Sequence, residues 1–314
     1  MIDVIIPAYN SHDTIEKTLY SISYQTIKDK LRVYIVNDAS ENDYSEMVNY
    51  FSNFINIEEL KLEKNSGPGV ARQYGIDHSN SEYIIFIDSD DVFFDCFSIK
   101  KLYDAIVTRK CDVVIGNFVE EVQSEFFSHN EDTIWLHGKI YKRKYIEENN
   151  IRFNDTRLNE DNGFNQLIFL GNSNISYLDY NVYIWCNNLK SITRKDNHSV
   201  LFELLLGYIY NINWALQESL KRKYDTEKIS SLAISALVAI YIHYIDFEKN
   251  KESKKILELA KPIKEIFDNN PIEIERKYDI MEAQYLSLFK TENKKCLFEP
   301  SITFNDFLKL VSKV

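Results

Sequence analysis

The sequence predicts an α/β protein with a mostly parallel sheet and helices on both faces, followed by an all-helical C-terminal region. Two observations carry this prediction. In the first third of the chain, short β-branched runs recur without polar alternation, and a helical pattern follows each run. From about Ser199 onward the strand-like runs stop, and apolar residues recur at helical spacing only. We therefore expect two domains, residues 1–198 and residues 199–314.

The first domain begins with four predicted strands, each short, apolar and rich in β-branched residues. They are expected at residues 4–6, 33–36, 57–62 and 83–87. Apolar residues spaced three or four positions apart follow each strand, which is typical of an amphipathic helix. These helices are expected at about residues 15–22, from about residue 42, from residue 70 and at about residues 98–108. Further strands are predicted at residues 111–116, 117–127 and 182–185, with a helix at about residues 162–170.

The C-terminal region is predicted to consist of several amphipathic helices. Helical patterns cover about residues 202–216 and 232–245, follow residues 253 and 272, and end with residues 304–311. These helices carry more aromatic residues than one stripe facing the first domain requires, and an exposed surplus usually marks a partner surface. We expect the region to pair two copies of the chain or to bind a peripheral partner; packing against the first domain alone is the alternative. The aromatic residues are Phe202, Tyr208, Tyr210, Trp214, Tyr241, Tyr244 and Phe247.

Composition and charge exclude several classes of protein. The 314 residues are 45% apolar and 27% charged, which is typical of a soluble globular chain with a sizeable core. The net charge of −11 offers no basic stripe to neutralise a phosphate backbone, so no nucleic acid partner is expected. The four cysteines lie far apart, which disfavours a zinc site or a disulfide framework and favours a reducing compartment.

The chain shows no targeting pattern and no pattern of a membrane-spanning helix. The N-terminus carries Asp3 where a signal peptide needs basic residues. The longest apolar stretch, near residues 232–242, is interrupted by Ser235 and is too short to span a bilayer. We therefore expect a cytoplasmic protein without a transmembrane segment, whose contact with a membrane is limited to peripheral association at the inner face.

Polar residues follow each of the four N-terminal strands, at the edge where an open α/β sheet binds its ligands. The carboxyl ends of parallel strands meet at one edge, so we expect these segments to build one site. They are Pro7-Ala8-Tyr9-Asn10, Asn37-Asp38-Ala39-Ser40, Asn65-Ser66-Gly67-Pro68-Gly69 and Asp88-Ser89-Asp90-Asp91.

Asp88 and Asp90 are the sharpest signal among these residues. Two carboxylates at positions i and i+2 after an apolar strand can project toward one divalent cation, whose other positions stay open to water and diphosphate oxygens. A turn followed by a helix cap is the alternative, because Asp is favoured in both places. A cap needs only one acid, however, and here three of four consecutive residues are acidic.

The other strand-end residues suit a nucleotide. Gly67 opens a Gly-rich entry to a helix with Arg72 in its first turn, where free N–H groups and a guanidinium can bind phosphate or ribose. An ordinary capped helix with a solvated Arg is the alternative. Tyr9 could stack on a base while Asp38 accepts from a base N–H; alternatively, Tyr9 belongs to the core and Asp38 only turns the chain.

A further acidic segment, Asn159-Glu160-Asp161-Asn162-Gly163, lies at the start of a predicted helix. A carboxylate held there near a bound electrophile is a candidate general base. An acid placed at the helix N-terminus because the helix dipole favours it is the alternative.

Taken together, these segments resemble the ordered signature of the family 2 glycosyltransferases with the GT-A fold. The resemblance rests on the order, strand-end placement and spacing of the motifs across about the first hundred residues. It extends more loosely to residues 137–143, 160–161 and 191–194, and it does not cover the helical region. Asn37 and Ala39 depart from the family, where a second Asp and a Gly are common. The matching segments are residues 4–10, 25–26, 36–40, 65–75 and 87–91.

The resemblance implies transfer of a sugar, with inversion, from a nucleotide diphosphate sugar, most often a UDP-sugar. Asp161 matches the base that deprotonates the acceptor hydroxyl. Asp90, together with Asp88, matches the ligands of Mn²⁺ or Mg²⁺. The acceptor is expected to be a glycan, a cell-surface polymer or a glycoprotein. The residues that match the nucleotide-sugar contacts are Pro7, Tyr9, Asp38, Gly67, Arg72, Asp88 and Ser89.

Four residues are candidates for the acceptor side: Trp135, His137, Glu160 and Arg194. A Trp in the core and a His on the surface are the alternatives for the first two. Two other functions stay open. A sugar nucleotidyltransferase needs Arg and Lys in a Gly-rich loop directly after the first strand, which this chain lacks. A non-catalytic nucleotide-sugar-binding scaffold would be expected to lose some of the site acids, which this chain keeps.

Overall fold

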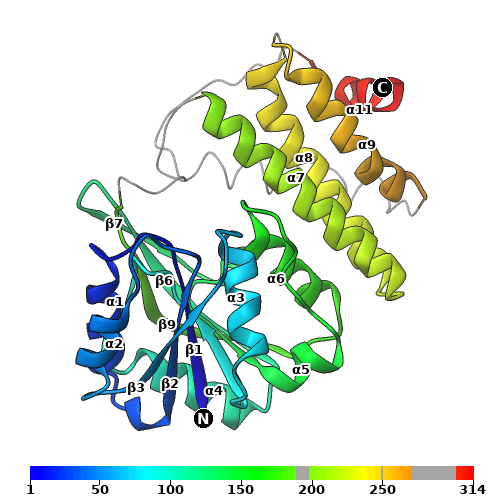
Figure 1. Ribbon diagram of the computed structural model, residues 1–314. Helices are drawn as coiled ribbons and strands as arrows, with labels where there is room; N and C mark the ends of the chain where they lie inside the picture. The colour runs from blue at the N-terminus through cyan, green and yellow to red at the C-terminus, as the bar shows by residue number, and fades with distance from the viewer. Residues whose placement is uncertain (189–197, 249, 270–301) are drawn as a thin grey trace. The chain divides into compact units, whose positions relative to one another are not determined.

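The computed structural model describes residues 1–188, 198–248, 250–269 and 302–314 (Figure 1). The chain divides into two compact units, Met1–Lys195 and Asp196–Val314. The first unit is built around a sheet, and the described part of the second consists of helices. This is the order of architectures that the sequence predicts.

The first half of the sheet is parallel and holds the four predicted strands. The nine strands follow the order β3-β2-β1-β4-β8-β6-β9-β5, with β7 paired to β6. Ala8, at the end of β1, lies opposite Asn37, at the end of β2, so the two strand-end loops begin side by side. The four parallel strands are β1 (Ile2–Ala8), β2 (Leu31–Asn37), β3 (Asn56–Lys61) and β4 (Tyr83–Phe86).

Helices cover both faces of this parallel half, as predicted. Val4 and Ile6 belong to a core shared with residues of α1 (Ile15–Ser23), α2 (Ser45–Phe51) and α4 (Ser98–Arg109). Ile5 faces the other side, where α3 (Pro68–Asp77) packs so closely that a Cβ on Gly75 would lie 2.5 Å from Ile5 Cγ2. Two further helices follow, α5 (Arg143–Glu148) and α6 (Glu160–Leu170), and α6 contacts α3.

The second half of the sheet is mixed. The strand β6 pairs in parallel with β9, while β8 is antiparallel to both β4 and β6. Antiparallel pairs are more numerous here than in the mostly parallel sheet expected, because β7 and β8 follow β6 without a crossover helix. The strands are β5 (Val92–Phe93), β6 (Val113–Val122), β7 (Glu125–His129), β8 (Lys139–Lys142) and β9 (Ile175–Trp185).

Some predicted boundaries in this half are wrong. Residues 111–116 and 117–127 do not form separate strands; β6 continues to Val122, and a tight turn at Gln123 and Ser124, both with positive φ, leads into β7. The strand β8 was not predicted. It has a Lys at each end, and Lys139 is fully buried, which an apolar pattern cannot reveal.

The second unit has its own apolar core. The described helices are α7 (His198–Lys221), α8 (Thr226–Phe247), α9 (Ser253–Asn269) and α11 (Phe304–Lys313). Tyr241, Tyr244 and Phe247 are buried in this core, where Phe307 packs against both tyrosines. The exposed aromatic surplus expected for this region is therefore mostly absent among these residues, although Tyr210 is 50% exposed. The helix predicted after residue 272 lies outside the described residues.

Two helices of the second unit are long and apolar enough to cross a membrane by length and composition. They span Ser199–Lys221 and Thr226–Ile245, and 39% and 56% of their apolar windows are buried inside the protein. The core helices of soluble proteins pass the same test, so the absence of a transmembrane segment stays a prediction.

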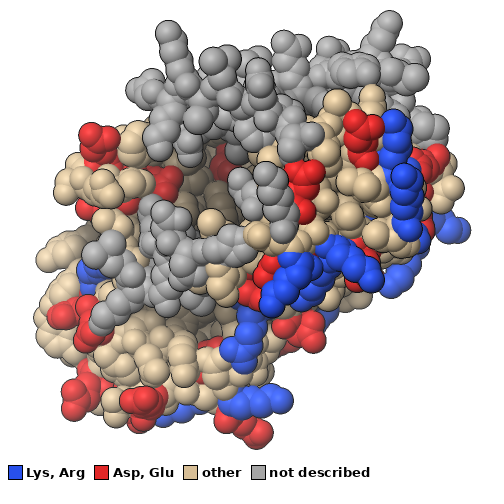
Figure 2. Space-filling model, turned by 90° about the horizontal axis from the view of Figure 1, so that it is seen from above, with Lys and Arg blue, Asp and Glu red and all other residues tan. Residues whose placement is uncertain are grey.

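Basic side chains on the helical unit lie close to acidic ones. Lys254 pairs with Glu258 at 3.5 Å, and Lys221 pairs with Glu218 at 2.8 Å, each about one helical turn apart. On the face seen in Figure 2, Lys and Arg atoms form short runs bordered by Asp and Glu atoms. Positive charge on this face is thus interspersed with negative charge.

Candidate active site

The loops after β1 and β2 are bonded to each other at the carboxyl edge of the sheet. The backbone N–H of Asn10 donates to Ser40 Oγ at 2.9 Å, and the N–H of Ser11 donates to the buried Tyr44 hydroxyl at 3.0 Å. Tyr9 is 51% exposed, so the alternative that it belongs to the core is wrong. Pro7, by contrast, is buried within β1. The two hydrogen-bonded loops thus leave the Tyr9 side chain exposed to solvent at the strand ends.

Asp38 holds the Gly-rich loop. Its Oδ1 accepts the N–H of Ser66 at 2.7 Å, and its Oδ2 accepts the N–H of Gly67 at 2.8 Å. The side chain is buried, which makes these two hydrogen bonds valuable to the fold. Asp38 therefore connects the end of β2 to the start of α3, and a contact of Asp38 with a base stays a prediction.

The start of α3 is closely packed against the segment that leads into α6. Gly67 precedes the helix with φ +94°, a conformation that favours glycine, and a Cβ there would lie 3.2 Å from Arg157 Cγ. Arg157 in turn donates to the side chain and the carbonyl of Asn65, at 2.7 and 2.9 Å. The sequence did not indicate this role of Arg157, because the contact joins residues 92 positions apart.

Arg72 lies between two acids from different parts of the chain. Its Nη2 donates to Asp88 Oδ1 at 2.6 Å, and its Nη1 donates to Glu160 Oε1 at 2.5 Å. Burial alone would lower the pKa of Arg72, but Asp88 and Glu160 raise it above its ordinary value. The guanidinium is thus a permanent cation that joins the end of β4 to the start of α6. Direct contact of Arg72 with a phosphate stays a prediction.

The acids after β4 have different surroundings. The Asp88 side chain is 34% exposed; burial would raise its pKa, but Arg72 and His137 hold that pKa below its ordinary value. Asp90 is partly exposed and accepts from Asn188 Nδ2 at 2.7 Å, and burial and then Asp88 raise its pKa. Ser89 donates to Ser11 Oγ at 2.8 Å. Asp88 and Asp90 therefore both stay accessible at the carboxyl edge.

Asp91 has a different place from its two acidic neighbours. It is 1% exposed and accepts from the Tyr183 hydroxyl at 2.6 Å and from the N–H of Cys186 at 2.8 Å. Burial, followed by the charges of Asp88 and Asp90, raises the pKa of Asp91 well above its ordinary value. Asp91 thus ties the turn after β4 to the end of β9. The sequence did not separate this role from that of Asp88 and Asp90.

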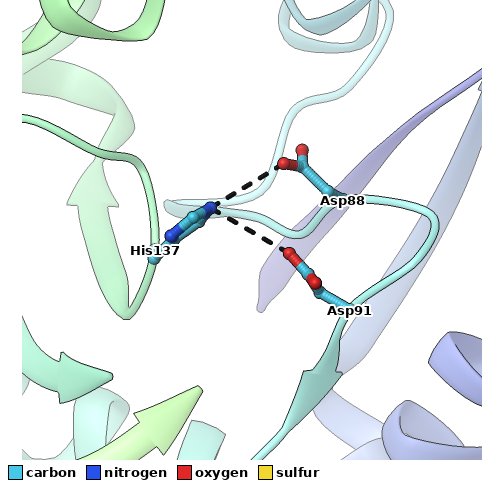
Figure 3. Close-up of side chains that lie close together, drawn as sticks. All are labelled: Asp88, Asp91 and His137. Carbon is cyan, nitrogen blue, oxygen red and sulfur yellow. Dashed lines mark ion pairs between the residues drawn. The ribbon is translucent and has the colours of Figure 1, made fainter. Parts of the chain in front are cut away.

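Asp88, Asp91 and His137 form a group that could hold a metal ion (Figure 3). One ligand atom of each lies within 4.8 Å of the others, and His137 Nε2 is 3.8 Å from Asp88 Oδ2 and 4.0 Å from Asp91 Oδ2. Two carboxylates and an imidazole suit a divalent cation such as Mn²⁺. This group shares Asp88 with the predicted pair but contains Asp91 and His137 in place of Asp90.

Aromatic rings surround His137, which is 6% exposed. The His137 ring stacks on the Tyr183 ring, with the ring centroids 4.6 Å apart. The Trp135 ring is nearly parallel to the His137 ring, with the centroids 6.2 Å apart. Trp185 is tilted toward His137 at 5.3 Å. The alternative that His137 is a surface residue is therefore wrong.

Asp161 lies in the first turn of α6, beside the buried Glu160. Its Oδ1 accepts the N–H of Asn162 at 2.8 Å. Burial and then the charge of Glu160 raise the pKa of Asp161 to about 7. A carboxylate with this proton affinity suits general-base work near neutral pH. The structure thus brings Arg72, Asp88, Glu160 and His137 together; Arg194 lies outside the described residues.

Known proteins resemble the chain in sequence. Glycosyltransferase GlyA of Streptococcus pneumoniae is 28% identical over 62% of this chain and 31% of GlyA. The poly(ribitol-phosphate) beta-N-acetylglucosaminyltransferase TarP of Staphylococcus aureus is 28% identical over 60% of this chain and 64% of TarP. The matched part is thus less than two thirds of either relative.

Solved structures resemble the chain in fold. Staphylococcus aureus TarS 1-349 in complex with UDP-GlcNAc matches with a TM-score of 0.70 at 17% identity, over 99% of this chain and 90% of that one. The mannosyltransferase PcManGT from Pyrobaculum calidifontis, in complex with GDP-Man and Mn²⁺, matches with a TM-score of 0.52 at 15% identity, over 99% and 86% of the two chains.

A family model described as Glycosyl transferase family 2 matches residues 3–163. This match covers the parallel strands, their carboxyl-end loops and the start of α6, which are the parts that build the site. It extends over about half of the chain, and the fold agrees with it. The chain belongs to glycosyl transferase family 2, and it has the GT-A fold.

Proposed function

We propose that this chain transfers a sugar, with inversion, from a nucleotide diphosphate sugar of the UDP-sugar class to a hydroxyl group of a glycan, a cell-surface polymer or a glycoprotein. The observation that best supports this proposal is the pair of ion bridges made by Arg72. They connect Asp88, at the end of β4, to Glu160, the neighbour of Asp161. The complex of TarS with UDP-GlcNAc supports the choice of donor.

The donor lies at the carboxyl edge in this proposal. Tyr9 stacks on the base, Asp38 holds the loop that approaches the phosphates, and Gly67 gives the backbone room to bend there. Pro7 and Ser89 shape the same edge.

A divalent cation fits this edge. Two sets of residues could hold it: Asp88 with Asp90, or Asp88 with Asp91 and His137. The ligand atoms of the second set lie within 4.8 Å of one another, whereas both residues of the first set are partly exposed and so more open to a ligand. When bound, Mn²⁺ or Mg²⁺ would neutralise charge on the leaving diphosphate. We favour Asp88 and Asp90 because Asp91 is 1% exposed and already accepts from Tyr183 and Cys186.

The base in this proposal is Asp161. Its carboxylate takes the proton of the acceptor hydroxyl as that oxygen forms a bond to the anomeric carbon. The bond between this carbon and the diphosphate oxygen breaks, and its electron pair leaves with the nucleoside diphosphate. Arg72 keeps Asp88 and Glu160 in place during this step, and Trp135, His137 and Arg194 are proposed to contact the acceptor.

Release of UDP from UDP-GlcNAc in the presence of Mn²⁺, with water in place of the acceptor hydroxyl and free GlcNAc as the second product, tests the proposed donor and the proposed base. The wild-type chain is expected to release UDP, and Asp161→Asn is expected to slow release about 10²–10⁴-fold, the usual contribution of a general base. Calorimetry should show nearly unchanged UDP binding by Asp161→Asn. A wild-type chain that neither binds UDP nor releases it from UDP-GlcNAc, UDP-glucose or UDP-galactose would contradict the proposed donor class.

Two further proposals concern the whole chain. We place the enzyme in the cytoplasm, with peripheral contact at the inner face of the membrane. We also propose that the helical unit forms the contact between copies of the chain in a homo-oligomer. Two of its apolar side chains, Tyr210 and Leu201, are 50% and 47% exposed. Light scattering of the full chain tests the second proposal; a monomer at all concentrations would contradict it.

A further inference from the structure

The carbonyl oxygen of Trp135 accepts hydrogen bonds from two buried side chains. Lys139 Nζ donates to it at 2.5 Å, and Asn165 Nδ2 donates to it at 3.0 Å. Asn165 Nδ2 also donates to the neighbouring carbonyl of Ile134 at 2.7 Å. The backbone of this turn is therefore held from β8 on one side and from α6 on the other.

Asp132 fixes the same turn from within. Its Oδ1 accepts the N–H groups of Ile134 and Trp135, at 3.0 and 2.8 Å, and it lies 3.4 Å from Lys139 Nζ. The backbone N–H and carbonyl groups of Ile134 and Trp135 thus all have defined partners. This turn leads directly to His137, whose Nε2 faces Asp88.

Asn165 connects the turn to the helix of the proposed base. It follows Asp161 by four residues in α6, so the two side chains share one face of the helix. Its Oδ1 accepts the hydroxyl of Tyr141 at 2.9 Å. Burial, and then the charge of Asp161, raise the pKa of Tyr141, which shows that Asp161 is within electrostatic reach.

The burial of these residues argues for more than packing. Lys139, Tyr141 and Asn165 are fully buried. Moving an ammonium group out of water costs several kcal/mol, and well-packed apolar residues often replace a buried ion pair without loss of stability. A Met at residue 139 would fill similar space, but it would leave the Trp135 carbonyl without its closest donor.

We propose that Lys139, Tyr141 and Asn165 are positioning residues that fix the turn carrying Trp135 and His137 relative to Asp161. They touch neither donor nor acceptor; they act through the Trp135 carbonyl and through α6. The part of this inference that concerns turnover rests on the proposed function, whereas the placement of Trp135 can be tested without it.

The first test follows Trp135 directly. The full chain is labelled with 5-fluorotryptophan, and the ¹⁹F resonance of Trp135 is assigned by its loss in Trp135→Phe. We expect Lys139→Met and Asn165→Leu to shift or broaden this resonance. Arg143→Met is the matched control, since it removes another buried cation, and its partner Asp3 is the second residue of β1, at the opposite edge of the sheet. A Trp135 resonance that changes no more than in this control would overturn the inference.

The second test measures turnover. Lys139→Met and Asn165→Leu are expected to lower the rate of UDP release from UDP-GlcNAc about tenfold, with the donor KM within twofold of wild type. Tyr141→Phe removes one hydroxyl only, so it provides a folded variant, with a smaller expected loss, if the others do not fold. Rates equal to that of Arg143→Met would overturn the positioning role. A wild-type chain that releases no UDP would contradict the proposed function. The ¹⁹F result would still show whether Lys139 and Asn165 fix the position of Trp135.

Discussion

The backbone of Gly69 lies so close to Glu160 that a Cβ at residue 69 would be 2.7 Å from Glu160 Cγ and 3.0 Å from its Cβ. The absence of a side chain at residue 69 thus allows the carboxylate of Glu160 to reach Arg72, one turn further along α3. The missing side chain of Gly69 is thus a condition for the ion pair between Arg72 and Glu160.

Gly69→Ala should therefore displace Glu160 and weaken its ion pair with Arg72. We expect a loss of about 1–3 kcal/mol in the free energy of unfolding, as is usual for overpacking, together with slower turnover. Urea denaturation measures the first and UDP release the second. In the Glu160→Ala background, where Cγ is absent, the same substitution should cost clearly less; an equal cost in both backgrounds would show that the contact is unimportant.

Arg72→Met should be strongly destabilising, because it leaves the buried Glu160 carboxylate without its cation. Breaking a buried ion pair by removing one partner costs about 3–5 kcal/mol. Thermal unfolding measures the loss. Adding Glu160→Gln removes the unpaired charge and should recover a large part of the stability but not the activity. Failure of this second substitution to recover any stability would mean that Asp88, and not Glu160, is the partner that matters.

The pH dependence of turnover should follow Asp161. With its pKa raised to about 7, the carboxylate is protonated below this value and cannot accept a proton, so the rate should rise with pH and level off above about 7. Initial rates between pH 5 and 9 measure the profile, and Asp161→Asn should abolish this limb. A rate independent of pH over this range would point to another base.

The same carboxyl group should affect stability in the opposite direction. Its pKa is raised in the folded chain above the ordinary value of 3.8, so the folded chain binds more protons between about pH 4 and 7. The stability from Asp161 is therefore lost as pH rises through this window. Above pH 7, Asp161→Asn should be more stable than wild type by roughly 1–4 kcal/mol, which denaturation at pH 5 and pH 8 can measure.

Replacement of the acids after β4 should separate the two candidate metal sets. Asp90→Ala is expected to abolish the dependence of UDP binding on Mn²⁺ while leaving the fold intact, because Asp90 is partly exposed. Calorimetry with UDP, with and without Mn²⁺, measures it. Asp91→Asn is the matched variant and should lower stability more than it lowers metal dependence, since it perturbs the contacts with Tyr183 and Cys186. The reverse result would favour the set of Asp88, Asp91 and His137.

The parallel half of the fold could be predicted because its signals are local. The apolar runs at residues 33–36 and 83–87 fall on β2 and β4, since strands buried on both faces carry few polar residues. The helical face at residues 98–108 falls on α4 for a similar reason, because a helix that covers a sheet shows its apolar side at regular spacing.

Much of the site could not be predicted because it depends on contacts between distant residues. A strand-end position identified Asp88, but the arrangement in which Arg72 pairs with both Asp88 and Glu160 requires α3, β4 and α6 to meet. Lysine side chains are seldom fully buried unless they are paired. Lys139 is fully buried, because its ammonium group binds Asp132 and the Trp135 carbonyl inside the turn. Asp90 and Asp91 are neighbours in the chain, and only the position of β9 shows that they have different environments.

The ion pair of Arg72 and Glu160 also has an evolutionary consequence. A chain that loses Glu160 would keep a buried guanidinium paired only with Asp88. A chain that loses Arg72 would keep a buried carboxylate without a cation. Neither change is easily tolerated alone, although the two codons lie 88 residues apart. Descendants of this sequence are therefore expected to keep both residues or to exchange both, so that positions 72 and 160 covary as a unit.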